Sequence, residues 1–298
     1  MASPLLECVP NVSEGRDLRA VEALADAVRS VAGARLADVH ADPDHHRSVF
    51  TFLGPPQAVE EAALALAAAV FARVDMREHR GHHPRLGALD VMPFVPLRDS
   101  TMADAIRIAR RVGQAIAAAH TLPVYFYGAA ATRPERTAVR EIRRGEYEGL
   151  AARLNTPGGW PDAGPAVFVP RRGGAMVGAR DILVAYNVWL DSHDLGAARD
   201  IARAVRESSG GLPAVQALGV PLERRGLVQV SMNLLNYRLT GIAAAYDAVT
   251  AEAALRGLTI RRAELVGLAP VRAFEGRAPE TVGLPDLADT KYLDAYLS

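Results

Sequence analysis

The order of apolar segments is the feature that most restricts the fold, because the same order occurs twice along the chain. In the first half, short apolar runs typical of strands alternate with segments whose apolar residues recur at helical spacing. The expected strands span residues 5–9, 35–39, 47–53 and 88–95, with helices after the first and third of them. The order is therefore β-α-β-β-α-β.

The second half repeats this order in a shorter stretch of chain. Its expected strands span residues 182–188, 214–220, 227–234 and 260–266, again with helices after the first and third. A split pattern of this kind folds as an antiparallel four-stranded sheet with both helices on one face. We therefore predict an α+β protein with two tandem subdomains, residues 1–178 and 179–298, that frame a substrate groove.

The composition excludes several classes of protein. Lys plus Arg and Asp plus Glu are equal at 34 each, so no overall field favours nucleic acid. The longest apolar run, residues 62–72, is shorter than the ~20 residues that a membrane span needs. The first residues lack the charged leader and apolar block of a secretory signal, and Cys8 is the only cysteine. We expect a cytoplasmic protein that binds neither nucleic acid nor membrane.

One loop concentrates side chains suited to proton transfer. Residues 79–85 hold three of the eight histidines and two arginines, immediately before the buried strand expected at 88–95. Histidine titrates near neutral pH, and arginine offers donors shaped for carboxylates. A second polar loop, expected between the strands at 35–39 and 47–53, contains His40, His45 and His46. These loops are either solvated surface or the place where chemistry occurs.

Six segments together are typical of one known family, and they occur in its order over nearly the whole chain. They are Glu7-Cys8-Val9-Pro10-Asn11-Val12-Ser13-Glu14-Gly15, His83-Pro84-Arg85-Leu86-Gly87-Ala88-Leu89-Asp90, Val124-Tyr125-Phe126-Tyr127-Gly128, Arg144-Gly145-Glu146-Tyr147-Glu148, Pro161-Asp162 with Gly164-Pro165, and Gln229-Val230-Ser231-Met232-Asn233-Leu234-Leu235. On these residues the chain resembles the formiminotransferase domain of formiminotransferase-cyclodeaminase. The cyclodeaminase part of that enzyme has no room here.

The resemblance implies a glutamate formimidoyltransferase, which moves the formimino group of N-formiminoglutamate to tetrahydrofolate in histidine degradation. It also implies a homodimer of two ferredoxin-like subdomains, with folate in a tunnel between them. In the family the histidine of the His-Pro-Arg motif takes part in proton transfer, and here this is His83. The matching folate-binding residues are Gly164, Pro165, Ala166, Val167, Phe168, Val169, Pro170, Arg171, Arg172 and Gly173.

At three positions the chain departs from the family pattern. His40 stands where the family commonly has the second aspartate of Asp-Val-Asp-Ala, and His82 stands where it has the glutamate before His-Pro-Arg. Ala129 follows Gly128 where a glutamate is usual. The resemblance therefore adds His40 and His82 to His83 as candidate catalytic residues.

The chemistry of formimino transfer leads to the same histidine. N5 of the folate attacks an amidine carbon, and the glutamate nitrogen must leave protonated, so one group has to take a proton and return it. A histidine near its ordinary pKa of ~6.5 does both at neutral pH. No oxidation state changes, so no metal or redox cofactor is expected. Both substrates carry carboxylates, for which the candidate anchors are Arg80, Arg85, Arg171 and Arg172.

Two other functions fit the same residues. A divergent folate-binding member of the family would use a formyl donor or lack catalysis. A metal-dependent hydrolase would use the histidine clusters with nearby carboxylates, and its candidate ligands are His45, His46, His79, His82, His83, Asp42 and Asp44. However, no His-Glu-x-x-His helix is present, and Pro84 prevents a helix from continuing through the loop.

Overall fold

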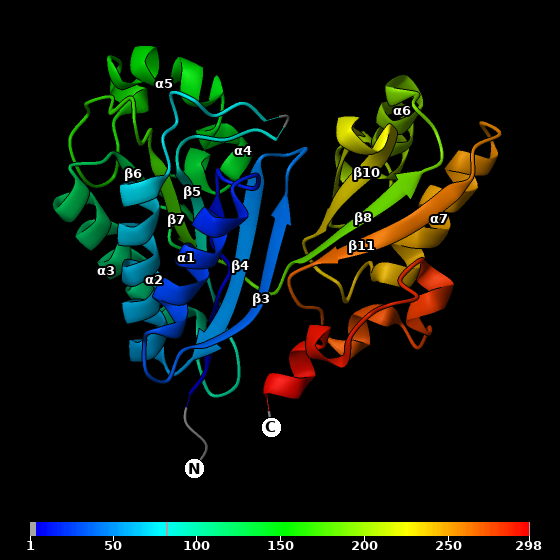
Figure 1. Cartoon of the computed structure of the whole chain (residues 1–298), viewed down its shortest axis with the longest axis horizontal. Coiled ribbons are helices and arrows are strands. Elements are labelled where there is room, and N and C mark those ends of the chain that lie inside the picture. Colours follow the sequence, from blue (N-terminus) through cyan, green and yellow to red (C-terminus); the bar gives the residue numbers. More distant parts are fainter. Residues whose placement is uncertain (1–3, 82, 298) are drawn as a thin grey trace. The chain divides into compact units, whose positions relative to one another are not determined.

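The chain forms two compact units, Met1–Arg180 and Asp181–Ser298, in a computed structural model that describes residues 4–81 and 83–297 (Figure 1). The boundary expected after residue 178 falls inside a strand that ends at Ala179. The fold is α+β, with one sheet in each unit.

The first unit contains seven strands and five α-helices among its described residues. The strands are β1 (Leu6–Cys8), β2 (Asn11–Val12), β3 (Arg35–Asp42), β4 (Arg47–Gly54), β5 (Leu89–Pro96), β6 (Val124–Gly128) and β7 (Ala175–Ala179). The helices are α1 (Leu18–Arg29), α2 (Pro56–Arg73), α3 (Met102–His120), α4 (Val139–Ile142) and α5 (Glu146–Leu154).

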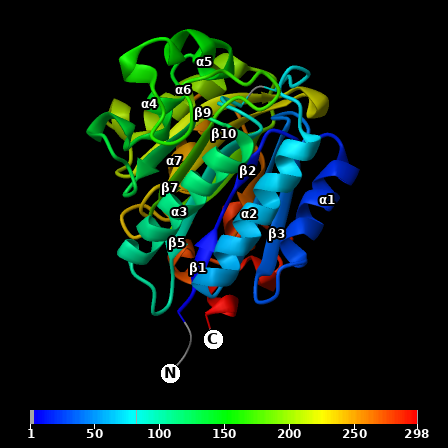
Figure 2. The same cartoon turned by 90° about the vertical axis from the view of Figure 1, so that its left-hand side faces the viewer.

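The seven strands form one mixed sheet. Strand β3 pairs with β4, β4 pairs with β1 and β2, and these pair with β5, all antiparallel. Strands β7 and β6 extend the sheet beyond β5 by parallel pairing. Helices α1, α2 and α3 cover one face, as Figure 2 shows, and share a single apolar core with it. Helices α4 and α5 pack on the other face through a smaller apolar cluster that includes Leu150, Tyr125 and Met176.

Three details of the first unit differ from the expected pattern. The strand expected at 5–9 is divided into β1 and β2, because Pro10 between them has no N–H to pair. Strand β3 extends to Asp42, so His40 lies on a strand instead of in a loop. Strand β7 was not predicted. All five of its residues are buried, and a parallel strand buried on both faces shows no alternation in its sequence.

The second unit has the predicted order of elements. It consists of β8 (Val184–Leu190), α6 (Leu195–Val205), β9 (Val215–Leu222), β10 (Leu227–Leu234), α7 (Ile242–Ala254) and β11 (Ile260–Val266). The sheet is antiparallel with strand order β11-β8-β10-β9. Alternate residues of its strands, such as Val188 and Val230, face α6 and α7 in one apolar core.

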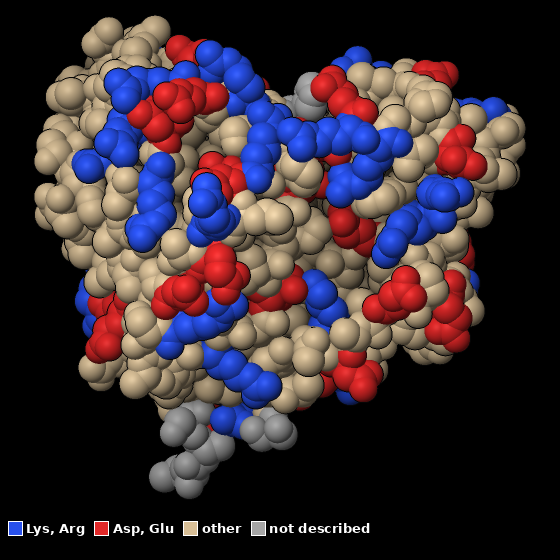
Figure 3. All heavy atoms as spheres, viewed as in Figure 1, with Lys and Arg blue, Asp and Glu red and all other residues tan. Residues whose placement is uncertain are grey.

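Two further observations concern the described part of the chain as a whole. None of its helices combines the length and the apolar character needed to cross a membrane. Basic and acidic side chains are interspersed on the face shown in Figure 3, in keeping with their equal numbers.

Candidate functional site

The histidine loop joins α2 to β5 and is held by backbone contacts to the predicted folate-binding stretch. The N–H of Met76 donates to the carbonyl of Arg171 at 2.9 Å, and the N–H of Ala88 donates to that of Arg172 at 2.8 Å. Gly87 and Gly173 form an isolated β-bridge. The structure therefore brings the end of the predicted stretch 164–173 against the loop that carries His83.

Gly173 is a position where this arrangement requires glycine. Its φ of +72° lies in the left-handed region, and a Cβ there would meet the carbonyl oxygen of Leu86 at 2.4 Å and the Cα of Gly87 at 2.7 Å. Any other residue would push the two segments apart. The glycine spacing in this part of the sequence thus serves a close backbone contact.

A buried ion cluster lies in the fold beside His83. Asp90, at the start of β5, is fully buried and accepts hydrogen bonds from the Leu86 N–H at 2.8 Å and from Arg47 Nη1 at 2.7 Å. Arg143, which follows α4, donates to both carboxylate oxygens of Asp90. Burial opposes ionisation, but the two arginines lower the pKa of Asp90 below its usual 3.8. One carboxylate is therefore shared by two guanidinium groups.

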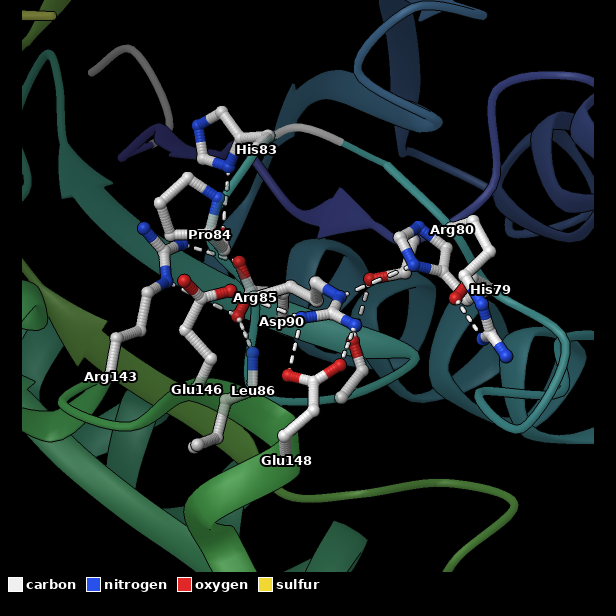
Figure 4. Close-up of polar contacts among 12 residues, drawn as sticks. His79, Arg80, His83, Pro84, Arg85, Leu86, Asp90, Arg143, Glu146 and Glu148 are labelled. Atoms are coloured by element: carbon white, nitrogen blue, oxygen red, sulfur yellow. Dashed lines mark hydrogen bonds and ion pairs between the residues drawn. The ribbon is translucent and has the colours of Figure 1, made fainter.

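The geometry around His83 defines which of its ring nitrogens carries the proton. Nδ1 lies 2.8 Å from the carbonyl oxygen of Pro84, which can only accept, so Nδ1 carries the proton and donates (Figure 4). In the neutral ring, Nε2 then keeps its lone pair. Burial, followed by the charges of Arg47, Arg143 and His45, holds the pKa of His83 well below 6.5. At neutral pH the ring is a base at Nε2.

Two other histidines, His46 and His79, form a structural contact near His83. The rings of His46 and His79 stack at 4.3 Å between centroids. His79 Nε2 donates to the carbonyl of His46 at 2.8 Å, and Nδ1 accepts from Arg85 Nε at 3.3 Å, so His79 is neutral. Burial lowers its pKa to about 4. His46 Nε2 lies 3.3 Å from the carboxylate of Glu14, and this contact connects the turn between β3 and β4 to the segment after β2.

The arginines proposed as anchors differ in how they are used. Arg85 is buried and binds Glu146 at 3.0 Å and Glu148 through two nitrogens, so its guanidinium holds α5 against the loop. Arg80 is exposed and donates to the carbonyls of Arg77 and His79. In Figure 4 Arg80 and His83 lie well apart among the residues drawn.

The predicted stretch 164–173 contacts different elements at its two ends. Gly164 and Pro165 line a cavity of about 510 Å³ with the C-terminal part of α3. No described residue of the histidine loop lines this cavity. Arg171 donates to the carbonyl of Ala72 at 3.0 Å and Arg172 to that of His120 at 2.9 Å. The intervening residues, Ala166, Val167, Phe168, Val169 and Pro170, are exposed or half-buried, and only the ring of Phe168 packs on an aromatic neighbour, Tyr147.

The other candidate residues lie as follows. His40 on β3 pairs with Val49 of β4 and is half-buried. Its charge is not among the leading effects on the pKa of His83, which come from burial, Arg47, Arg143 and His45. His82 lies outside the described residues. Ala129 is exposed, just beyond β6.

The ligands proposed for a hydrolytic metal centre do not converge. Among the described residues, no three of the candidate set His45, His46, His79, His83, Asp42 and Asp44 bring their ligand atoms within 4.8 Å of one another. Both ring nitrogens of His79 already have partners. This geometry gives no support to the alternative of a hydrolase built on the histidine clusters.

Sequence reasoning missed the charged residues that surround His83. Asp90 ends the quoted His-Pro-Arg motif, and Arg143 belongs to a visible pair of arginines, but nothing in the spacing joins them to Arg47. The available signal was a lone aspartate inside an otherwise apolar strand. Such a residue has to find a cationic partner when it is buried.

Comparison with known proteins gives a consistent result. Residues 5–180 match the family described as the formiminotransferase domain, N-terminal subdomain, and residues 185–279 match the formiminotransferase domain. The chain is 44% identical over 272 residues to the glutamate formimidoyltransferase of Thermoplasma acidophilum, covering 91% of this chain and 89% of the relative. It is 38% identical to the enzyme of the same name from Streptococcus pyogenes serotype M1, covering 91% and 90%. It is 42% identical to the formimidoyltransferase-cyclodeaminase of Rattus norvegicus, of which it covers 51%.

Proposed function

Because this chain belongs to the formiminotransferase domain family, we propose that it is a glutamate formimidoyltransferase whose proton carrier is His83. The substrates are N-formiminoglutamate and tetrahydrofolate, and the products are glutamate and 5-formiminotetrahydrofolate. The observation that carries the assignment of His83 is its bond to Pro84, which leaves Nε2 as the acceptor.

The proposed reaction has two steps. N5 of tetrahydrofolate forms a bond to the amidine carbon while Nε2 of His83 takes the N5 proton, which gives a tetrahedral intermediate. The bond from that carbon to the glutamate nitrogen then breaks, and the same proton passes from Nε2 to the departing nitrogen. The lowered pKa of His83 suits both steps, since the free base is present at neutral pH and its conjugate acid gives up the proton readily.

Residues around His83 support this role without touching the reacting atoms. The Pro84 carbonyl fixes the tautomer, and the cluster of Asp90 with Arg47 and Arg143 fixes the start of β5 behind the ring. Arg85, first considered as an anchor, acts here as a positioning residue through its ion pairs with α5. His40 and His82 remain candidates on the family pattern, at positions where relatives commonly have carboxylates.

The remaining parts of the proposal concern binding and organisation. We infer that stretch 164–173 contacts the folate, since its end is bonded to the histidine loop. We also infer that each unit is a ferredoxin-like subdomain, which its β-α-β-β-α-β order supports, with β6 and β7 as an extension in the first unit. A cytoplasmic homodimer is part of the same proposal and is supported by the family resemblance.

The test is turnover of N-formiminoglutamate with tetrahydrofolate by the purified full chain. We expect glutamate and 5-formiminotetrahydrofolate in equal amounts. The control donor is N-formylglutamate, which differs only in the transferred group. A protein that uses N-formylglutamate and not N-formiminoglutamate, or that binds tetrahydrofolate and transfers neither group, would contradict the assignment.

A further inference from the structure

Arg143 keeps a donor that its structural contacts do not use. Its Nε and Nη2 both bind Asp90, with Nε lying 3.3 Å from Oδ1. Within residues 4–81 and 83–297, Nη1 of Arg143 has no hydrogen-bond partner, and in Figure 4 this nitrogen points away from Asp90. The side chain of Arg143 is 15% exposed, whereas that of Asp90 is 0% exposed. Arg143 therefore offers a ligand a partly exposed side chain and N–H groups at Nη1 that its structural contacts do not use.

The charges around this edge favour an anion. Arg47 and Arg143 share the single carboxylate of Asp90, so the three groups together carry one excess positive charge. The leading charge effects on His83, from Arg47, Arg143 and His45, all oppose its protonation, which indicates a positive field at the ring. A bound carboxylate would cancel that charge, and a guanidinium edge matches its planar geometry.

The chemistry of the two substrates decides which carboxylate lies there. In N-formiminoglutamate the nitrogen that leaves is attached to the same carbon as the α-carboxylate. In tetrahydrofolate the glutamate carboxylates are separated from N5 by the methylene and aminobenzoyl groups. When Nε2 of His83 is close enough to protonate the departing nitrogen, the α-carboxylate of the donor must also lie near the ring, whereas its γ-carboxylate is at the end of a flexible chain.

We propose that Arg143 binds the α-carboxylate of the formimino donor beside His83 and so selects donors derived from α-amino acids. This inference rests on the proposed function. The bound carboxylate also brings a negative charge close to His83, which makes Nε2 a stronger base once the donor is in place. Arg143 is therefore a specificity-determining residue that couples donor binding to the base.

The experiment compares two donors that differ by one carboxylate. N-formiminoglutamate carries both carboxylates, and N-formimino-4-aminobutyrate lacks only the α-carboxylate. With the wild-type protein we expect kcat/KM to be lower for the second donor by about 10- to 100-fold, the range for a lost charge-assisted hydrogen bond. Arg143→Gln should lower kcat/KM for N-formiminoglutamate about 10- to 100-fold more than that for N-formimino-4-aminobutyrate, mainly through KM, so that the preference between the two donors is lost whatever loss they share through Asp90 and His83.

The matched control is Arg140→Gln, on α4 and 68% exposed, which should leave both donors unaffected. An equal loss for both donors in Arg143→Gln would show that Arg143 acts only through Asp90, and the inference would be wrong. Wild-type protein that uses the two donors equally well would also overturn it, without any variant. Should Arg143→Gln fail to fold, Arg143→Lys keeps the charge and tests the same donor preference.

Calorimetric binding of N-formiminoglutamate alone separates this inference from the proposed reaction. Binding that is weakened by Arg143→Gln, in a protein without transferase activity, would support the carboxylate site and contradict the reaction. Transferase activity with a donor affinity that Arg143→Gln leaves unchanged would support the reaction and contradict the site.

Discussion

The ring of His45 lies 5.8 Å from the ring of His83, centroid to centroid, and the two ring planes are tilted by 44°. His45 is buried and lies in the turn between β3 and β4, where its N–H donates to the carboxylate of Asp42 at 2.8 Å. When His45 is protonated, its charge disfavours a second charge on His83 and lowers the pKa of His83. Two histidines from distant loops are thus electrostatically coupled.

This coupling predicts the pH dependence of the His45→Gln variant. Removal of the neighbouring charge should raise the pKa of His83, so the acid limb of kcat/KM should move to higher pH. Turnover at neutral pH should change by less than about tenfold, because His45 does not carry the proton. The measurement is a pH profile of kcat/KM for both proteins on the same substrates. An acid limb that stays in place would show that Arg47 and Arg143, without His45, set the pKa.

Glu7 on β1 provides a test of stability instead of activity. Burial raises the pKa of Glu7 from 4.5 to about 7, although the charge of Arg180 opposes this shift. The native state therefore holds a proton that the unfolded chain releases, and stability should fall as pH rises from about 4.5 to about 7. The loss is at most on the order of 3 kcal/mol, at ~1.4 kcal/mol per pKa unit.

The variant Glu7→Gln removes this titration. It should be more stable than the wild type at about pH 8 and lose the difference at about pH 5, as measured by chemical denaturation at both values. A constant difference in unfolding free energy between the two proteins across this range would show that Glu7 is ionised throughout, in a tighter pair with Arg180.

Gly173 tests the contact between the histidine loop and the stretch 164–173. Gly173→Ala should lower the unfolding free energy by about 1–3 kcal/mol, because alanine is strained at a φ of +72° and its Cβ would meet the carbonyl of Leu86. The KM for tetrahydrofolate should rise at the same time. Gly158→Ala is the control, since a Cβ at Gly158 meets nothing within 4 Å. Equal stability of the two variants would contradict the close contact.

Much of the fold could be predicted from the sequence because its elements have clear periodicity. The strands expected at 227–234 and 260–266 correspond to β10 and β11, and the helix expected after the first strand of the second half corresponds to α6. Strand β7 could not be predicted, since its residues Ala175–Ala179 are small or apolar throughout and show no period. The pairing of distant strands in a mixed sheet cannot be predicted from the spacing of residues within one short segment.

The same limit applies to the site. The histidine loop and His83 were visible as a polar cluster before an apolar strand, whereas the burial that lowers the pKa of His83 was not. Among the described residues, the leading charges near His83 belong to Arg47, Arg143 and His45, which the local sequence does not connect to it. Arg47 starts β4 and Arg143 follows α4, so only the folded sheet brings them to Asp90.

The most direct test of the central claim is the turnover of His83→Ala with N-formiminoglutamate and tetrahydrofolate, measured beside His82→Ala. We predict that His83→Ala lowers kcat by about 10² to 10⁴ while the KM for tetrahydrofolate changes little, the range for a lost general acid and base. His82→Ala should retain far more activity than His83→Ala. Near-normal turnover by His83→Ala, with loss of turnover in His82→Ala, would contradict the assignment of the proton carrier.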